Sequence, residues 1–268
     1  MFRLLGKASS QSKIATVDIT AAKSSETLLH ALNWIHHFNT QTVVIGLTAG
    51  SYKDDQRRQE LLTDIYFLAS IGARPVIVHG GTQSHDQYDS NRAAQEIAVE
   101  LNEKLASEYE AIGGRAMTLN FESGAVLQGE ASDGKSLGTI ASVDRIVIDN
   151  LCYAGQTPVI PTMCEGPSSE KILVDDVAAI PFIASGLAAK AAVVVLPELS
   201  SDETSIAAGD LDSFAKQTGI SADASTAISA AIESGVESVQ LVDGNVPHAL
   251  LLQLFTEHRP GVEIKKVI

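Results

Sequence analysis

Hydrophobic positions along the chain follow two different spacings. Short runs of β-branched and other apolar residues predict buried strands, and longer stretches with apolar residues three and four positions apart predict helices. The strands predicted for one sheet are Val43–Gly46, Pro75–Val78, Ala116–Leu119, Pro158–Pro161, Val193–Leu196 and Ser238–Val242, with a last strand at Glu263–Val267. The predicted helices are Leu28–Phe38, Arg57–Ser70, Ala93–Ile112, Ile146–Ala154, Asp175–Ala188, Thr226–Gly235 and His248–Thr256. Because strands alternate with helices, the sequence favours an α/β fold with right-handed crossovers and a mainly parallel sheet.

Two segments depart from this alternation. Gly124–Gly129 and Gly138–Val143 bracket a polar turn, so we expect them to form short antiparallel strands. Glu198–Ser225 is the least periodic part of the chain and is rich in Ser, Asp, Ala and Gly. That composition predicts an irregular excursion on the surface.

Composition narrows the class of protein. The chain has 268 residues, of which 45% are hydrophobic, so it can bury a core and is not expected to be disordered. The formal net charge is −14, so the chain does not have the excess of basic residues that is typical of nucleic-acid-binding proteins. The same charge disfavours binding to an anionic membrane surface. No apolar stretch predicts a signal peptide or a membrane span, so the expected location is the cytoplasm. The two cysteines, Cys152 and Cys164, predict small buried residues rather than a disulfide framework.

Candidate chemistry lies in two glycine-containing turns that follow strands. Thr48-Ala49-Gly50 follows the first strand, and His79-Gly80-Gly81-Thr82 follows the second. Ligands of open α/β sheets bind beyond the carboxyl ends of the strands, and glycine lets the backbone approach an anion closely. Neither turn matches the phosphate-binding loop or the dinucleotide fingerprint, and each is also compatible with a purely structural turn.

Five segments, taken in order, resemble one family. These are ETLLHALNWIHHFNTQTVVIGL, LLTDIYFLASIGARPVIVHGG, AIGGRAMTL, the stretch from Asp144 to Pro161, and SGVESVQLVDGNVPHALLLQLFTE. Their order and spacing are similar to those of acetylglutamate kinases, members of the amino-acid-kinase superfamily, from about Glu26 to the C-terminus. The resemblance implies a three-layer αβα sandwich with a central, mainly parallel sheet. It also implies one domain over 1–268, with a substrate-side half at 25–165 and a nucleotide-side half at 166–268.

The resemblance further implies a reaction, the transfer of the γ-phosphoryl group of ATP to a carboxylate of acetylglutamate, with ATP and Mg²⁺ as cofactors. In the family two lysines flank the transferred group and an aspartate orients them, which fits the need to offset charge in phosphoryl transfer. The lysine positions fall on Gly46 and Ala224, and only the aspartate, Asp176, is retained. The family's Asn-Ala-Asp motif falls on Val174-Asp175-Asp176. No resident metal site is expected.

Other basic residues are candidates to replace the missing cations. Lys53 follows the first turn and is the better candidate, because Lys190 lies about 20 Å along the helix from Asp176 by helix geometry. The lid that follows the second turn in the family is absent, and the arginine that would hold a substrate carboxylate falls near Gln83. Arg92 is the nearest substitute in the sequence, or alternatively an ordinary charge on a helix surface.

A C-terminal resemblance concerns regulation and assembly. Arginine-inhibited members carry a His, a Glu and a Gly-Thr turn in this region. Here His248 is present as a candidate effector residue, Gln253 replaces the Glu, and Gly261-Val262 replaces the turn. The resemblance implies a homo-oligomer, at least a dimer, to which Ala93–Ile112 is long enough to contribute.

Three functions stay open at this stage. The first is a working acetylglutamate kinase. The second is a non-catalytic family member that binds acetylglutamate, arginine or a nucleotide, or serves as a partner subunit. The third is a different enzyme that uses the same cleft, with Asp175, Asp176 and His79 as candidates. An acetyltransferase is not expected, because the chain has no room for an additional acyltransferase domain.

Overall fold

The computed structural model describes residues 32–52, 54–81, 91–120, 125–132, 137–256 and 259–266. The chain divides into two compact units, Met1–His37 and Phe38–Ile268. Within the first unit, residues 32–37 are helical, in agreement with the amphipathic pattern there. All further elements belong to the second unit. The predicted division into a substrate-side and a nucleotide-side half stays a prediction.

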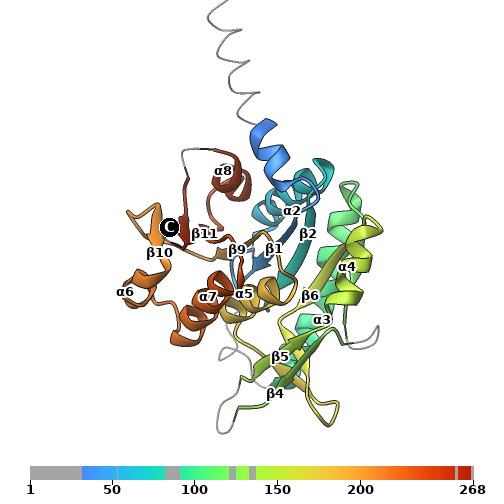
Figure 1. Cartoon of the computed structure of the whole chain (residues 1–268). Helices are drawn as coiled ribbons and strands as arrows, with labels where there is room; N and C mark the ends of the chain where they lie inside the picture. Colours follow the sequence, from blue (N-terminus) through green and yellow to red (C-terminus); the bar gives the residue numbers. More distant parts are fainter. Residues whose placement is uncertain are drawn as a thin grey trace, which may run out of the picture. The chain divides into compact units, whose positions relative to one another are not determined.

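The second unit is built on an eight-stranded sheet with the strand order β10-β12-β11-β9-β1-β2-β6-β3. Figure 1 shows β11, β9, β1, β2 and β6 following one another across the molecule. Every neighbouring pair is parallel except β11 and β12. The strands are β1 (Thr42–Leu47), β2 (Arg74–His79), β3 (Ala116–Thr118), β6 (Thr157–Pro161), β9 (Ala191–Leu196), β10 (Ser205–Ala207), β11 (Ser238–Asp243) and β12 (Val262–Lys265). The predicted mainly parallel sheet is therefore confirmed.

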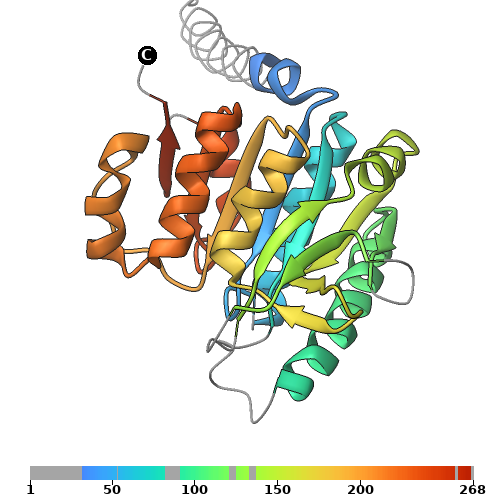
Figure 2. The same ribbon diagram turned by 60° about the horizontal axis from the view of Figure 1, so that its bottom comes forward.

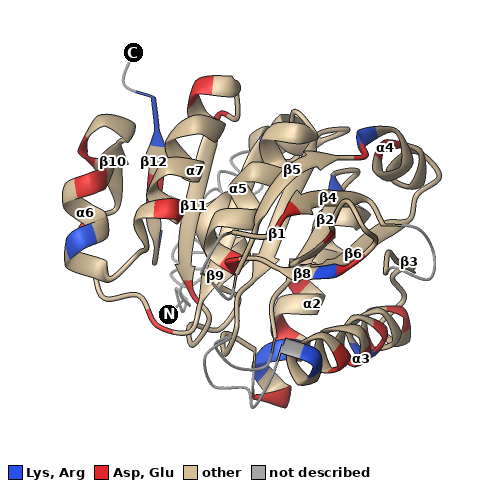
Figure 3. Cartoon of the chain, turned by 90° about the horizontal axis from the view of Figure 1, so that it is seen from below, with Lys and Arg blue, Asp and Glu red and all other residues tan. Residues whose placement is uncertain are grey.

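Helices cover both faces of this sheet and complete three layers. They are α2 (Asp55–Ser70), α3 (Asn91–Ala111), α4 (Arg145–Tyr153), α5 (Asp176–Gly186), α6 (Leu211–Thr218), α7 (Ala222–Ser234) and α8 (Ala249–Phe255), with a short 3₁₀ turn, η2 (Ala208–Asp210). Figure 3 shows α4, α5 and α7 on one face and α2 and α3 on the other. Helix α8 packs against α2. The three-layer αβα sandwich is the fold that the sequence predicts.

A second, four-stranded sheet has the order β5-β4-β7-β8. Its strands are β4 (Leu127–Glu130), β5 (Thr139–Val143), β7 (Met163–Glu165) and β8 (Lys171–Leu173). Strands β4 and β5 pair antiparallel, as their polar connecting turn predicts. In Figure 2 the yellow-green and yellow strands of this sheet lie beside the gold helix α5, which β5 contacts.

Residues 198–225 correct one prediction. Instead of an irregular excursion, this segment contains β10, η2, α6 and the first turn of α7. Leu211, Phe214 and Ala215 are buried on one side of α6. Their spacing is helical, but the polar residues around them weaken the pattern, and Gly219 ends the helix in a left-handed conformation.

Polar side chains fix the starts of the helices next to the candidate site. Asp54 accepts a hydrogen bond from Arg57 N at the start of α2, and Asp175 accepts one from Ala178 N at the start of α5. Ser221 does the same for Ala224 N at the start of α7. Because each cap supplies an acceptor to an otherwise unpaired amide, these three helices begin at defined residues.

The predicted core cysteines are confirmed: Cys152 in α4 and Cys164 in β7 are both buried. Burial raises the pKa of Cys152 to about 12 and that of Cys164 to about 11. Neither thiol is therefore set up as a nucleophile. Among the described residues, none of the helices is long and apolar enough to cross a membrane.

Candidate functional site

The turn after β1 is closed by its own hydrogen bonds. Thr48 is buried, and both its backbone N–H and its hydroxyl donate to Val195 O, at 3.2 and 2.6 Å. Ser51 donates twice to Thr48 O, from its amide at 3.0 Å and from its hydroxyl at 2.8 Å. Gly50 takes a φ of 86°, a left-handed conformation that glycine adopts without strain. The turn is thus held by contacts within the protein.

The turn after β2 lies directly beside the first one. Gly80 N donates to Leu47 O at 3.0 Å, which continues the pairing of β1 with β2. The buried Tyr52 hydroxyl, which comes from the end of the first turn, is 2.7 Å from Gly80 O and 3.1 Å from Gly81 O. The two glycine turns are therefore brought together as the sequence predicts. Thr82, the last member of the predicted turn, lies outside the described residues.

Asp176 joins the two turns to a third strand. Its Oδ2 accepts from Ala49 N at 2.9 Å, and its Oδ1 accepts from the hydroxyl of Thr162 at 2.6 Å. A Cβ atom at Gly80 would lie only 1.9 Å from the same Oδ2, so glycine is required there for the carboxylate to pass. The carboxylate therefore stands between the ends of β1, β2 and β6, where the sequence predicts it.

His79 is a core residue. Its side chain is fully buried, with Nδ1 3.0 Å from Gly80 O and Nε2 3.1 Å from Asn102 Oδ1. Burial lowers the pKa of His79, so the ring is neutral at physiological pH. A neutral imidazole carries one N–H, so it donates to one of these two oxygens. Enclosed in this way and away from solvent, the ring is suited to holding the second turn rather than to moving protons.

The two positions that the resemblance assigns to lysines are both buried in the protein. A Cβ atom added at Gly46 would lie 1.9 Å from Cδ1 and 2.2 Å from Cγ1 of Ile180, a buried residue of α5. Ala224 is completely buried in the first turn of α7. Neither position has room for a long charged side chain in this packing. The sequence alone does not reveal Ile180, since its contact with Gly46 joins residues far apart in the chain.

Lys53 and Lys190 are the candidates to replace the two missing lysines. Lys53 lies outside the described residues. Lys190 forms an ion pair with Glu237, and its backbone N donates to Thr42 O at the first residue of β1, the end of the strand opposite the turns. The prediction that Lys190 points away from the site is therefore confirmed.

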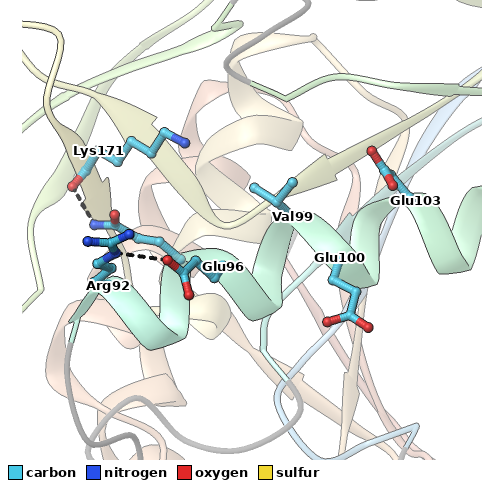
Figure 4. Close-up of a pocket in the computed structure, with 7 residues that line it drawn as sticks. Arg92, Glu96, Val99, Glu100, Glu103 and Lys171 are labelled. Atoms are coloured by element: carbon cyan, nitrogen blue, oxygen red, sulfur yellow. Dashed lines mark hydrogen bonds and ion pairs between the residues drawn. The ribbon is translucent and has the colours of Figure 1, made fainter.

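Arg92 is a surface residue of α3. Its side chain is 87% exposed and pairs with Glu96, one turn along the same helix, at 2.8 Å. It lines a shallow hollow of about 610 Å³ together with Lys171 and the acidic residues Glu96, Glu100 and Glu103 (Figure 4). The helix-surface interpretation of Arg92 fits this geometry better than a grip on a substrate carboxylate.

The two C-terminal residues that the resemblance links to arginine binding, His248 and Gln253, both contact other residues of the protein. His248 adopts a left-handed backbone conformation, with a φ of 53°, and its Nδ1 is 2.7 Å from Oδ1 of the fully buried Asp64 on α2. Gln253 is buried and engaged on both sides, donating to Gln240 Oε1 at 2.7 Å and accepting from Gly261 N at 2.8 Å. At this position the amide stabilises the C-terminal strand, and both of its polar atoms already bond within the protein.

The pair of His248 and Asp64 predicts a pH-dependent contribution to stability. Asp64 raises the pKa of His248 above its ordinary value, while burial raises the pKa of Asp64. A raised folded-state pKa of His248 means that its stabilisation is complete below the unfolded value of about 6.5 and is lost as pH rises through the folded value. At acidic pH, protonation of Asp64 removes the attraction between the two charges.

We therefore expect His248→Gln to destabilise the protein most near about pH 6, with a smaller difference at pH 9 and at pH 4. Urea unfolding of both proteins followed by circular dichroism measures this difference. Glu60 and Arg57, the other charges near His248, act in opposite directions on its pKa. A difference that stayed constant from pH 4 to pH 9 would contradict the pairing of charges.

Several residues that hold the site were not apparent from the sequence. Tyr52, Thr162 and Ile180 carry no motif, and each makes its contact with a partner distant in the chain. For Tyr52, the only available signal was its position directly after the first turn. The predicted phosphate-loop residues and Asp176 are thus placed together, but their donors and acceptors are largely bonded to one another.

ATP and Mg²⁺ do not fit this arrangement well. The amides of Thr48, Ala49 and Gly80, which a phosphate cradle would need, all donate within the protein. Both oxygens of Asp176 already accept hydrogen bonds. Across the described part of the chain, no three His, Cys, Asp or Glu residues are grouped to hold a metal ion.

Comparisons with known proteins agree with the fold and the order of motifs. No protein-family model matches the chain. An acetylglutamate kinase from Synechocystis sp. is 26% identical over 88% of this chain and 92% of its own length. An acetylglutamate kinase from Beutenbergia cavernae is 27% identical over 92% of each chain.

Among solved structures, proteins with the same fold as this chain are found. The N-acetylglutamate synthase from Neisseria gonorrhoeae, complexed with coenzyme A and N-acetyl-glutamate, aligns with a TM-score of 0.76 at 21% identity. The alignment covers 91% of this chain and 64% of the synthase chain, so this chain spans less than two thirds of that protein. Over about nine tenths of its length the chain is similar in sequence to acetylglutamate kinases, and it has the amino-acid-kinase fold.

Proposed function

We propose that this chain is a non-catalytic relative of acetylglutamate kinase, acting in arginine biosynthesis as a ligand-binding or partner subunit. The observation that carries the proposal is the packing of Ile180 against Gly46, where the family resemblance places a lysine. The second lysine position, Ala224, is equally enclosed. Phosphoryl transfer depends on cations positioned at the transferred group, and this arrangement offers neither of them.

The fate of Asp176 supports the same proposal. In the family the aspartate orients the two lysines. Here its carboxylate bonds to Ala49 N and to the hydroxyl of Thr162, so it fastens the first turn to the end of β6. A residue of the reaction machinery has become, in this proposal, a structural link between strands.

We expect the purified full chain to phosphorylate N-acetylglutamate at least about 10³-fold more slowly than an active relative, since each lost charge contact alone costs 10²–10³ in rate. The assay supplies ATP and Mg²⁺ and traps the acyl phosphate with hydroxylamine. The Synechocystis acetylglutamate kinase serves as the positive control. Calorimetry with ATP, N-acetylglutamate and arginine then identifies any ligand that binds without being converted.

A working kinase is the alternative, favoured by similarity to kinases over 88% of the chain. In that case Lys53 would be the replacement lysine. Turnover at the rate of the relative, dependent on N-acetylglutamate and abolished by Lys53→Ala, would overturn the non-catalytic proposal.

We also expect the protein to form at least a homodimer. Helix α3 is long, and its surface carries both signs of charge, with Arg92 paired to Glu96 and with Glu100 and Glu103 further along the helix (Figure 4). Light scattering over a hundredfold range of protein concentration measures the mass directly. A mass of one chain, 28.3 kDa, throughout that range would rule the dimer out.

A further inference from the structure

The outward side of helix α4 exposes apolar side chains. Ile146 is 75% exposed, Tyr153 68% and Val147 38%, and the exposed Asn150 lies between them. Their spacing of three and four residues places them on one side of the helix, opposite the side that α4 buries in the core. We call these four residues the α4 face, and none of them is charged. Figure 3 shows α4 at one edge of the second unit.

Strand β3 extends this apolar surface at the edge of the main sheet. In register, Met117 of β3 lies beside Pro158 of β6. The adjacent Thr157 points toward α3, because its hydroxyl is 3.2 Å from the hydroxyl of Tyr109. Successive side chains of a strand alternate, so Met117, which is 41% exposed, points to the side that α4 covers. Exposed apolar residues grouped in this way mark interaction surfaces, whereas scattered ones need no explanation.

Two guanidinium groups lie at the C-terminal end of α4. That of Arg74 stacks on the Tyr153 ring, 4.2 Å from its centroid. That of Arg115 lies 3.0 Å from the side-chain amide of Gln156, two residues beyond the C-cap, Ala154. Neither arginine forms an ion pair with a described residue.

The N-terminal end of α4 carries a carboxylate instead. Asp144, the exposed N-cap, accepts a hydrogen bond from Val147 N at 3.2 Å, and it too has no ion pair in the described part of the chain. Arg145 and Asp149, which follow it on the helix, neutralise each other at 2.9 Å. One end of α4 is therefore acidic and the other basic.

Two copies of the chain can cover this surface for each other. In an antiparallel pair of α4 helices with a two-fold axis at Asn150, Val147 of each copy lies level with Tyr153 of the other. Ile146 is then level with the small Ala154. The amide of Asn150 both donates and accepts, so it can bond to its own counterpart on the axis. The α4 face is therefore complementary to itself in shape.

The same arrangement is complementary in charge. Asp144 of each copy comes to the end of α4 at which Arg74 and Arg115 of the other copy lie. Because the whole chain has a formal net charge of −14, two copies repel one another, and a contact surface that opposes unlike charges offsets this repulsion locally.

Helix α3, the other candidate surface, suits a second copy less well. Its exposed basic residues are Arg92 and Lys104, and its exposed acidic residues are Glu96, Glu100, Glu103 and Glu110. Pairing two α3 helices would bring these acidic rows together.

We infer that the α4 face is the surface through which two copies of this chain pair, with their α4 helices antiparallel. The inference rests on the homodimer proposed for this protein and assigns its contact surface to α4 rather than to α3. It does not depend on whether the protein transfers phosphate. A second copy fits better than an unrelated protein, because the face supplies both halves of each contact itself.

Analytical ultracentrifugation of the full chain measures the dimer dissociation constant. Ile146→Arg should raise it at least about tenfold, because it replaces an apolar contact by a cation near Arg115 of the second copy. The side chain at this position is mostly exposed within one chain, so the variant should fold as the original does, which circular dichroism checks. Glu100→Arg is the matched control, because it places the same side chain at an exposed position of α3 and should leave the dimer intact.

A charge reversal tests the antiparallel arrangement. Arg115→Glu should weaken the dimer, since it brings a carboxylate to Asp144 of the second copy. Adding Asp144→Asn removes that repulsion and keeps a good N-cap on α4, so the double variant should dimerise more tightly than Arg115→Glu alone. A double variant that is weaker than Arg115→Glu would contradict the arrangement.

Cross-linking tests the position of the two-fold axis. Asn150→Cys should form a disulfide between two copies when diamide accepts the two electrons and two protons of the thiols. The original chain should not link, because Cys152 and Cys164 are buried, and Glu100→Cys on α3 should not link either. A mass of one chain at every concentration would overturn the homodimer and this inference together. A dimer that withstands Ile146→Arg and gives no link through Asn150→Cys would overturn the α4 surface alone.

Discussion

Gly46→Lys should unfold the protein or leave it only marginally stable. Its Cβ atom alone would stand 1.9 Å from Ile180 Cδ1, inside the core. Overpacking typically costs about 1–3 kcal/mol, and burying an unpaired ammonium adds several more, against a total stability of about 5–15 kcal/mol. Urea unfolding followed by circular dichroism measures the loss.

The reason for this loss can be isolated by removing the obstructing side chain. Ile180→Ala alone should cost about 2–5 kcal/mol through the cavity that it leaves. In the double variant Gly46→Lys/Ile180→Ala the two losses should not add, and the coupling should reach at least about 1–2 kcal/mol. Asp176 lies one helical turn before Ile180 on α5, so its carboxylate can then reach the new ammonium.

A smaller pair of substitutions separates shape from charge. Gly46→Ala tests the contact with Ile180 without a charge, and we expect it to cost about 1–3 kcal/mol. Gly209→Ala is the matched control, because a Cβ atom there meets nothing within 4 Å and the residue has no positive φ. If the two alanine variants were equally stable, Ile180 would not fill the lysine position as described.

The strands of the main sheet could be predicted because each buried strand is a short run of apolar residues in the sequence. TVVIGL in β1 and AAVVVL in β9 are almost continuous apolar runs, as expected for parallel strands covered on both faces. Helix α6 was not predicted, because it is short and only one narrow side of it is apolar. Periodicity is informative when it extends over several turns, and α6 has too few.

The candidate site could be predicted only in part, for a different reason. Glycines after strands and an aspartate at a helix start indicate which residues meet, since topology brings the carboxyl ends of parallel strands together. Whether an amide in such a turn faces a ligand or a protein acceptor depends on distant residues. Here the amide of Thr48 donates to Val195 O, and the amide of Ala49 donates to the Asp176 carboxylate. No local pattern encodes those partners.

Asp176→Ala should be the most destabilising substitution of a polar residue at the site, by about 3 kcal/mol. It removes the acceptor for Ala49 N and for the hydroxyl of Thr162, and it leaves a gap beside Gly80. Asp176→Asn keeps one carbonyl oxygen and the same shape, so it should lose only about half as much. Asp202→Ala, at an exposed aspartate, should stay within about 0.5 kcal/mol of the original protein.

Hydrogen exchange distinguishes this structural role from a catalytic one. If Asp176 fastens the two turns, Asp176→Ala should speed exchange at the amide of Ala49, which loses its acceptor, more than at Ile45 in the middle of β1. Thr162→Val removes one of the two bonds to the carboxylate and should give a smaller loss of stability, about 1 kcal/mol. A stable Asp176→Ala variant with unchanged exchange at Ala49 would mean that the carboxylate is held at the site for a ligand instead, and the proposal of a non-catalytic protein would lose its second support.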